Sequence, residues 1–540
     1  MEFMKVLYPS FLFLYFLIFV SPGIEIAHGA FPQGDEIMHV RTVRESLETD
    51  NLFIPQLNGL ANAYKPPLLF WAGMLSDVLF GESFLSERLV SLLFGFLTTI
   101  LLYCGILAFG KSSRFAFQIS LVYASTFAAW KFSRLLMMEQ MLTFFLFLFV
   151  YLYLRFQKEK KIAYFLFGII SLNIAYFIKG PLVIFYAIVL PLSFLAVDLL
   201  RIRKRKLNVN WQSILKYKHI LLFPLSFLIP ILWMFYLSRY SNEGALLIKF
   251  FLFNENVGKF FSENQPMLRI LGGWLLYTIP FTPFLFLFIS RVISTKINTR
   301  EKRILRVIAY FLLGLTLLHL LPNRKDSYYV TPFIPILFLG VSLSLSEAKI
   351  TSYFENPWLG RIYILLFIGI AIFSFWNSES KILIVSAVTI LFLFVSLYTQ
   401  YRFQIQFLIS VLFIPLIAGI ILPTFQNPLP ANDLQSFQLT RLCVVSENPW
   451  HGMDYQNQLR KTMVIYSPPS SATDLCENQN LPILSLSNFY SPGKKYIPSI
   501  SWYVWKAHLE IGVNDFLEIV QNVHSLKFKE QIQFYEVERR

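Results

Sequence analysis

The sequence is poor in charged residues, in acids above all, and in cysteine, and it has no internal repeat. Charged residues make up 15% of the 540 positions, and only 32 Asp and Glu stand against 47 Lys and Arg. Hydrophobic residues make up 56%, whereas soluble domains average roughly 45–50%. This composition excludes a soluble enzyme. With three cysteines the chain can form at most one internal disulfide, and the missing repeat argues against many transporter folds, which are built from repeats.

Long apolar runs dominate the sequence. A helix that crosses a hydrocarbon layer of about 30 Å needs roughly 17–25 such residues. Suitable runs lie near 5–20, 86–109, 115–131, 140–154, 162–178, 182–199, 219–237, 270–290, 304–321, 329–345, 362–376, 382–399 and 405–423. We therefore expect an α-helical, polytopic membrane protein with about thirteen transmembrane helices.

The basic residues of the short loops predict the orientation, because Lys and Arg are retained on the cytoplasmic side of a membrane. Alternate loops carry most of these residues, above all the segment 201–218. The N-terminus is therefore expected in the cytoplasm, and the first loop (21–85), the loop at 238–269 and the tail from about 424 are expected outside. The formal charge of +15 then follows from topology, and we expect no nucleic-acid partner.

The first apolar segment has two interpretations. The stretch "MEFMKVLYPSFLFLYFLIFV", followed by "AHGA", is similar to a secretory signal. We favour a retained helix, because only Lys5 precedes the apolar stretch and the stretch is long for a signal. Both interpretations leave residue 35 outside the cytoplasm.

The chain divides into a membrane domain, 1–423, and a tail, 424–540, joined by the link "PTFQNPLPAND". In the tail, "RLCVVS" (441–446) and "TMVIYS" (462–467) predict strands, and "NDFLEIVQNVHSL" (514–526) predicts a helix, so we expect a small α/β domain. It contains no catalytic constellation. Cys443 and Cys476 both lie in this tail, where a disulfide and two unpaired thiols are equal alternatives.

The first external loop holds two adjacent acids, Asp35 and Glu36, in "FPQGDEIMHV". The positions that follow place Ile37, Val40, Val43 and Leu47 at helical spacing, which predicts an amphipathic helix on the membrane surface. Asp35 begins that helix, where a carboxylate can cap free backbone amides. On this pattern alone, a cap is the plainer interpretation of Asp35.

Lys65 precedes two prolines in "YKPPLLFWAGMLSDVLF", which predicts the start of a second amphipathic helix. A lysine beside the free amides of a helix start is a suitable place for a phosphate. The alternative is a lysine that reaches to the lipid headgroups.

Several segments of the sequence together resemble those of a known enzyme family. The segment "GDEIMHV … NLFIPQLNGLANAYKPPLLFW" resembles the first periplasmic loop of GT-C-type glycosyltransferases that use polyprenyl-phosphate sugars, in the bacterial branch of lipid A aminoarabinose transferases and relatives of protein O-mannosyltransferases. Three further landmarks follow in the family's order, namely "SRLLMMEQMLTFF" (133–145), "IKGPL" (178–182) and "RKDSYYVTPFIP" (324–335). About thirteen spans followed by an external domain is also that family's architecture. The resemblance covers most of the first 340 residues.

The resemblance implies a membrane glycosyltransferase of the bacterial inner membrane, with the tail in the periplasm. The enzyme would move a sugar from a polyprenyl-phosphate carrier to lipid A, another envelope glycan or a protein. It implies Asp35, Glu36 and Glu139 as catalytic residues, with Asp35 as the general base toward a hydroxyl acceptor. It further implies a donor-phosphate site made by a set of basic and phenolic side chains, namely Lys65, Arg324, Lys325 and Tyr329.

Each of these residues also has a structural interpretation. Lys, Arg and Tyr are enriched at the ends of transmembrane helices in any membrane protein. Glu139 lies at the outer end of a span, where a salt bridge to Arg134 is the alternative to a catalytic role. For Lys179, a tight connection between helices is favoured over function.

The sequence departs from the family pattern at four positions. Met38 and His39 stand where Arg and Tyr are common, Tyr64 stands where a Glu often precedes the lysine, and Glu139 replaces an Asp. The sugar and the acceptor are therefore not carried over. No cofactor is expected, although a divalent metal held by His39 with one of the neighbouring acids is an open alternative. A lipid or solute transporter is the alternative function.

Overall fold

The structure is a computed structural model of the 540-residue chain. It describes residues 2–25, 34–62, 64–204, 223–225, 227–240, 242–294, 300–421, 434, 437, 439–446, 449–459, 462–486, 492, 493, 495–505, 518, 521, 522, 525, 527 and 529–537. These residues form two compact units. The first contains 1–24, 42–353 and 410–415, and the second contains 25–41, 354–409 and 416–540. The expected domain boundary at 423 lies outside the described residues.

Nine helical segments in the described part of the chain are long and apolar enough to cross a membrane. They are Phe84–Ala108 (α4), Met138–Glu159 (α7), Ile162–Lys179 (α8), Leu182–Arg201 within α9 (Leu182–Lys204), Arg303–Leu320 within α15 (Arg300–Leu320), Ser327–Ser344 (η5, Ser327–Phe333, with α16, Ile334–Ser344), Pro357–Trp376 (α18), Ser380–Tyr398 (α19) and Arg402–Gly419 (α20, Arg402–Leu416, with η6, Ile417–Ile421). Each coincides with an expected span, so the protein is confirmed as a polytopic helical membrane protein.

The expected count of thirteen spans is not confirmed. The run at 270–290 forms two helices, α13 (Leu268–Tyr277) and α14 (Thr282–Ser294), bent by 110°. The run at 115–131 breaks into α5 (Ser113–Ala124) and α6 (Phe127–Phe132), because Thr126 leaves the helical conformation and its hydroxyl caps the amide of Ala129. The last two expected runs correspond to shorter apolar helices, Leu7–Val20 (α1, Glu2–Tyr15, with η1, Phe16–Val20) and Leu228–Arg239 within α11 (Leu228–Tyr240).

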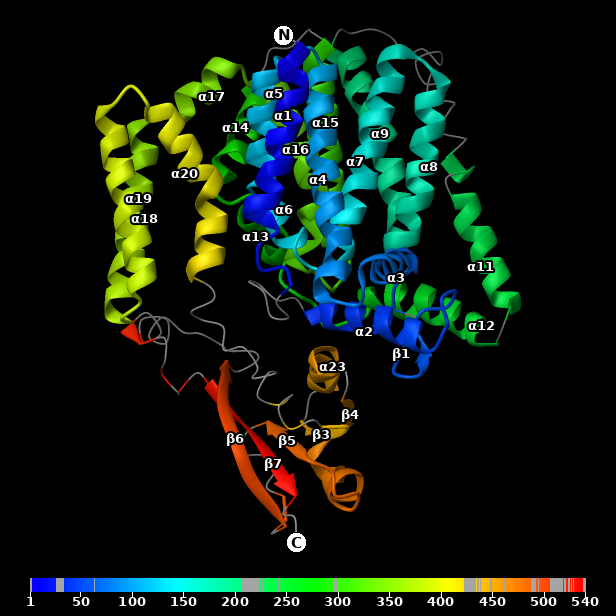
Figure 1. Cartoon of the computed structure of the whole chain (residues 1–540). Helices are drawn as coiled ribbons and strands as arrows, with labels where there is room; N and C mark the ends of the chain where they lie inside the picture. Colours follow the sequence, from blue (N-terminus) through cyan, green and yellow to red (C-terminus); the bar gives the residue numbers. More distant parts are fainter. Residues whose placement is uncertain are drawn as a thin grey trace. The chain divides into compact units, whose positions relative to one another are not determined.

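In the first unit, α4, α5, α7, α15 and α16 pack together as a bundle (Figure 1). Helix α4 begins sharply, because the Ser83 hydroxyl accepts from the amide of Ser86 and the Ser86 hydroxyl accepts from the amide of Ser83. This reciprocal capping box satisfies backbone donors that would otherwise lack partners. Helix α8 ends at Gly180, whose φ of +72° suits glycine.

The first loop folds into α2 (Gly34–Glu48), a short hairpin of β1 (Gln56–Leu57) and β2 (Leu60–Ala61), and α3 (Leu68–Phe80). Asn58 and Gly59 form the two-residue turn, both with positive φ, which the Asn-Gly pair tolerates well. The carboxylate of Glu45 accepts from the amides of Asn58 at 2.8 Å and Gly59 at 2.5 Å. The "LNG" motif therefore folds back onto α2, and Glu45 is buried instead of facing water.

Four further short helical segments lie in or at the edge of the first unit. They are α12 (Asn242–Lys249), η3 (Phe250–Val257), η4 (Gly258–Phe260) and α17 (Glu347–Phe354). The segment η3–η4 supplies polar residues to the site described below.

The tail forms a five-stranded sheet in the order β4-β3-β5-β7-β6. Its strands are β3 (Arg441–Val445), β4 (Met463–Ser467), β5 (Ile483–Leu486), β6 (Tyr496–Trp505) and β7 (Lys529–Val537), and helix α23 (Pro449–Gln458) connects β3 to β4. Strands β3, β4 and β5 are parallel, while β7 pairs antiparallel with β5 and β6. The two strands and the α/β class predicted for the tail are confirmed, whereas the helix predicted at 514–526 lies largely outside the described residues.

Two apolar clusters hold the tail sheet, one on each face. One contains Leu442, Val444, Leu484 and Phe534. The other contains Cys443 and Cys476, which are joined in a disulfide with a Cα–Cα distance of 5.8 Å. Of the two alternatives for these cysteines, the structure has the disulfide.

Candidate active site

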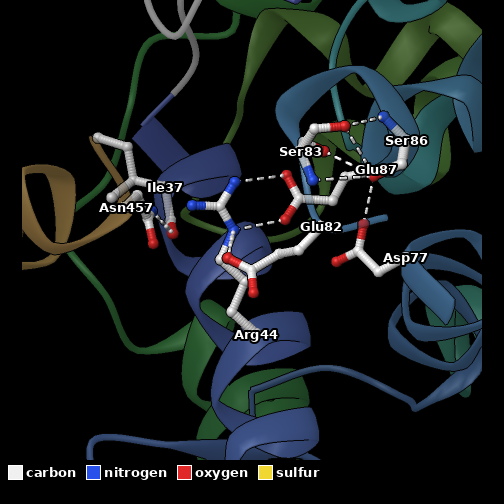
Figure 2. A network of polar contacts seen from close by, with 8 residues as sticks. All are labelled: Ile37, Arg44, Asp77, Glu82, Ser83, Ser86, Glu87 and Asn457. Carbon is white, nitrogen blue, oxygen red and sulfur yellow. Dashed lines mark hydrogen bonds and ion pairs between the residues drawn. The ribbon is translucent and has the colours of Figure 1, made fainter. Parts of the chain in front are cut away.

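The first turn of α2 carries the two acids of the first loop. Asp35 is half-buried and Glu36 is 5% exposed. Because both lie in the first turn, their charges also meet the positive end of the helix dipole. From the tail helix α23, the Asn457 side-chain amide donates to the backbone oxygen of Ile37 at 2.9 Å (Figure 2). This bond ties the tail to the turn that carries the acids.

A buried ion pair lies inside the first unit at the start of α7 and the end of α8. Lys179 donates to Glu139 Oε1 at 3.0 Å, and Glu139 is 2% exposed. Its other oxygen, Oε2, is buried and makes no hydrogen bond to any residue that the structure describes. Arg134, the expected alternative partner, instead donates to the backbone oxygens of Val20 at 2.5 Å and Pro22 at 2.6 Å. A carboxylate oxygen with an unused lone pair is therefore available inside the bundle.

Two tyrosines cover Lys179. The ammonium lies 5.8 Å from the ring centre of Tyr328 and 5.7 Å from that of Tyr329, within cation–π range. Tyr329 also packs at 5.3 Å from the ring of His319, whose Nε2 is 2.8 Å from the Tyr186 hydroxyl. The landmark "RKDSYYVTPFIP" thus contributes an aromatic wall to the Glu139–Lys179 pair.

A second group of charges centres on Glu255. Its Oε2 lies 3.4 Å from Lys65 Nζ and 3.5 Å from Lys259 Nζ. The pKa of Lys259 is lowered from 10.5 to about 8, first by burial and then by the positive charges of Lys65, Lys179 and Arg324, against the opposing effect of Glu255. Lys65 and Lys259 thus lie on either side of one carboxylate, and the charges of Lys179 and Arg324 also act on Lys259.

Arg324 and Lys325 occupy different surroundings. Arg324 Nε pairs with Asp326 at 3.1 Å, and its backbone amide donates to the Lys259 oxygen at 3.2 Å. Lys325 is 3% exposed, and its ammonium donates to Asn264 Oδ1 at 2.9 Å and to the Asn323 oxygen at 3.3 Å. Arg324 therefore contributes charge to the site, whereas the contacts of Lys325 with Asn264 and Asn323 hold the neighbouring loop.

The wall behind Lys65 is apolar. A pocket beside it is lined by Lys65, Pro66, Tyr176, Phe177, Trp233, Met234, Leu247, Ile248 and Phe251. Leu247 also lines an open groove of about 370 Å³, with Leu60, Ala61, Leu246, Lys249, Phe250 and Asn254. One site thus offers cations for an anion and, directly beside them, apolar surface for a chain attached to it.

Within the described residues, no three or more His, Cys, Asp and Glu side chains gather as the ligands of a metal would. His39 is buried in α2. A divalent metal held by His39 with a neighbouring acid stays an open alternative.

Comparisons with known proteins agree with this arrangement. Residues 32–242 match the family model of the dolichyl-phosphate-mannose-protein mannosyltransferases. A protein of Aquifex aeolicus is 27% identical over 326 residues, which cover 58% of this chain and 68% of that protein. The undecaprenyl phosphate-alpha-4-amino-4-deoxy-L-arabinose arabinosyl transferase 1 of Proteus mirabilis is 24% identical over 326 residues, covering 58% of this chain and 55% of that enzyme. The chain thus spans about half the length of this arabinosyl transferase.

Solved structures share the fold. ArnT from Cupriavidus metallidurans bound to undecaprenyl phosphate aligns with a TM-score of 0.66 at 13% identity, over 98% of this chain and 97% of that one. The apo form aligns with a TM-score of 0.67 at 15% identity, over 89% and 92%. The chain has the fold of these transferases, and residues 32–242 resemble the mannosyltransferase family in sequence. The predicted resemblance, fold class and class of enzyme are confirmed.

Sequence reasoning missed three residues of the transferase site. Lys259 and Glu255 lie in the outer loop at 238–269, which contains no landmark of the family pattern, and Lys179 was interpreted as part of a tight connection. The signal for Lys179 was its place at the end of an apolar span, at the same outer surface as Glu139. For Lys259 and Glu255, their spacing of four residues in a helical segment predicts only that they pair with each other.

Proposed function

We propose that the transferase moves a sugar from a polyprenyl phosphate to an acceptor at the periplasmic surface of the inner membrane. The observations that carry this proposal are the two lysines that share the Glu255 carboxylate, Lys65 and Lys259, and the apolar surface beside them, which is a small pocket next to Lys65 and the open groove that shares Leu247 with it. A phosphate joined to an isoprenoid chain has the matching pair of properties. A purely apolar ligand would not pair with the cations, and a free nucleotide would not cover the apolar wall.

The donor phosphate lies among these cations in the proposed complex. During transfer, the acceptor oxygen forms a bond to the sugar carbon C1 while the bond from C1 to the phosphate oxygen breaks. The electron pair of that bond stays on the polyprenyl phosphate, which gains negative charge. Cations already in place stabilise this charge in the transition state more than in the ground state, and this difference accelerates the reaction.

Asp35 takes the proton when the acceptor is a hydroxyl, as a general base within reach of the nucleophile. Glu36, its buried neighbour in the first turn of α2, is the second acid proposed there. A phosphate acceptor such as that of lipid A is already ionised, so Asp35 would then orient it. Glu139 Oε2, which makes no hydrogen bond of its own, is suited to accept from a hydroxyl of the sugar.

Lys325 and Tyr329 complete the proposed donor site. Tyr329 offers a hydroxyl donor beside Lys179, and Lys325 supports the loop on which Arg324 lies, while its role as a direct phosphate ligand stays a prediction. Lipid A, another envelope glycan and a protein remain the candidate acceptors. The relatives named for arabinosyl transfer favour the first of these, and the family model of protein mannosyltransferases favours the third.

The test compares cells that carry the wild-type protein, Asp35→Asn or a deletion. Mass spectrometry of their lipid A, glycolipids and envelope glycoproteins would show one glycan mass that disappears in both altered strains. That mass would name the sugar and the acceptor. Unchanged glycans in the deletion strain would contradict the proposal and leave lipid or solute transport as the function to test.

A further inference from the structure

Helix α2 carries the proposed catalytic acids at its start and a buried arginine near its end. Arg44 is 2% exposed and holds the fully buried carboxylate of Glu87 with two bonds, Nε to Oε1 at 2.6 Å and Nη2 to Oε2 at 3.1 Å. Figure 2 shows the guanidinium and the carboxylate face to face across these two contacts. Two parallel bonds between planar groups fix direction as well as distance.

The surroundings of the pair restrict it further. The guanidinium carbon of Arg44 lies 4.7 Å from the ring centre of Phe84, and that of Arg88 lies 5.0 Å from the same ring. Glu82 adds a longer contact of 3.5 Å to Arg44 Nε. Arg44 is therefore held by an ion pair and by a ring.

The carboxylate that receives Arg44 belongs to a fixed frame. Glu87 lies in the first turn of the spanning helix α4, immediately after the Ser83–Ser86 capping box. The Ser86 hydroxyl also donates to Asp77 Oδ1 of α3, and the Ser76 hydroxyl of α3 donates to the Ser86 oxygen at 2.5 Å. The start of α4 is thus fixed to α3 by contacts that do not involve α2 (Figure 2).

A buried ion pair is a poor way to gain stability alone, since well-packed apolar residues of similar volume often serve as well or better. A forked pair differs from an apolar contact in one respect, because it allows only one rotation of the helix about its axis. An α-helix turns about 100° per residue, so a residue nine positions away lies about 180° around it. Arg44 and Asp35 therefore lie on opposite sides of α2.

We propose that Arg44 and Glu87 are a positioning pair, which sets the rotation of α2 and so aims Asp35. This inference rests on the catalytic role proposed for Asp35. A rotation of about 20° at a side-chain radius of about 6 Å displaces a carboxylate by about 2 Å. Because a misplacement of about 1 Å can cost about 100-fold in rate, a loosened α2 should slow transfer without changing the donor-phosphate site.

The test replaces the pair by apolar residues. The double variant Arg44→Met, Glu87→Leu removes both charges at once and leaves neither one buried alone. The matched control is a second forked pair that joins two helices, Arg303 with Asp198 at 2.8 and 3.0 Å, changed to Arg303→Met, Asp198→Leu. Asp35→Asn is measured in parallel.

Three quantities are compared for full-length proteins. They are the unfolding temperature in detergent, the affinity for undecaprenyl phosphate, and the initial rate at which the glycan lost on deletion forms after induction to equal protein levels. We expect the Arg44–Glu87 double variant to bind undecaprenyl phosphate within twofold of wild type and to form the glycan at least tenfold more slowly. The control double variant should keep its rate.

A wild-type rate in the folded Arg44–Glu87 double variant would overturn the proposal. If that variant does not fold, Arg44→Lys is measured in its place, since lysine keeps the charge and loses the two-bond fork. We expect Arg44→Lys to fold and to form the glycan slowly. A wild-type rate in Arg44→Lys would again refute the positioning role. If Asp35→Asn itself keeps the rate, the proposed function of Asp35 fails, which is a separate outcome.

Discussion

The depressed pKa of Lys259 makes the affinity for the donor phosphate depend on pH. Burial, with the charges of Lys65, Lys179 and Arg324, lowers that pKa from 10.5 to about 8. The lysine therefore carries its proton at pH 7 and loses it as the pH rises through 8. If the phosphate is held by the charged form, the apparent Kd increases by the factor 1 + 10^(pH − pKa). That factor is about 1.1 at pH 7 and about 11 at pH 9, so the affinity should fall about tenfold.

The assay is a titration of the purified protein with undecaprenyl phosphate at a series of pH values between 7 and 9. Ionic strength is held constant, because screening would otherwise change the same affinity. The second phosphate ionisation lies near pH 6 for phosphomonoesters, so the ligand changes little in this window. Tryptophan fluorescence is a suitable signal, since Trp233 lines the pocket beside Lys65.

Lys259→Arg is the decisive control. Arginine stays charged throughout this range, so the variant should bind with an affinity that changes less than twofold between pH 7 and 9. A wild-type protein with a flat profile would refute the reasoning, and so would an arginine variant with the tenfold decline of the wild type. Either result would mean that Lys259 does not meet the phosphate as a cation.

Three further predictions concern stability and the tail. Lys179→Met should lower the free energy of unfolding by about 3–5 kcal/mol, because the buried Glu139 carboxylate loses its cation. The double variant Lys179→Met, Glu139→Leu should recover most of this loss. Thermal unfolding in detergent measures both variants. Reduction of the Cys443–Cys476 disulfide, which closes a sequence separation of 33, should destabilise the tail by about 3.5 kcal/mol in urea unfolding. Asn457→Ala should slow transfer several-fold at unchanged affinity for undecaprenyl phosphate, and an unchanged rate would show that the bond to the first turn of α2 has no functional effect.

Hydropathy predicted which segments cross the membrane, because burial in lipid depends on composition and length alone. It could not predict where a span breaks. The run at 115–131 is apolar throughout, yet Thr126 caps a new helix there, and this choice depends on packing against other helices. The bend of 110° between α13 and α14 is likewise a property of the fold and not of the local sequence.

The candidate site was predictable at the residues that lie in motifs and not at those that lie between them. Asp35, Lys65 and Glu139 each belong to a landmark of the resembling family. Lys259 joins the site only because the outer loop at 238–269 folds back toward Lys65, and its neighbour Glu255 then meets both lysines. Contacts across such distances in sequence leave no periodic pattern that local reasoning could detect.

The sequence as a whole has few acids, and the site around Lys65 and Lys259 has few as well. Lys65 and Lys259 share a single carboxylate, that of Glu255, at 3.4 and 3.5 Å. Two cations with one acid between them leave positive charge unbalanced, and desolvation makes that imbalance more costly, as the lowered pKa of Lys259 records. In the proposed complex, the donor phosphate would supply the missing negative charge. A second carboxylate at this place would balance the same positive charge in the free protein, and it would thereby weaken the binding of the donor.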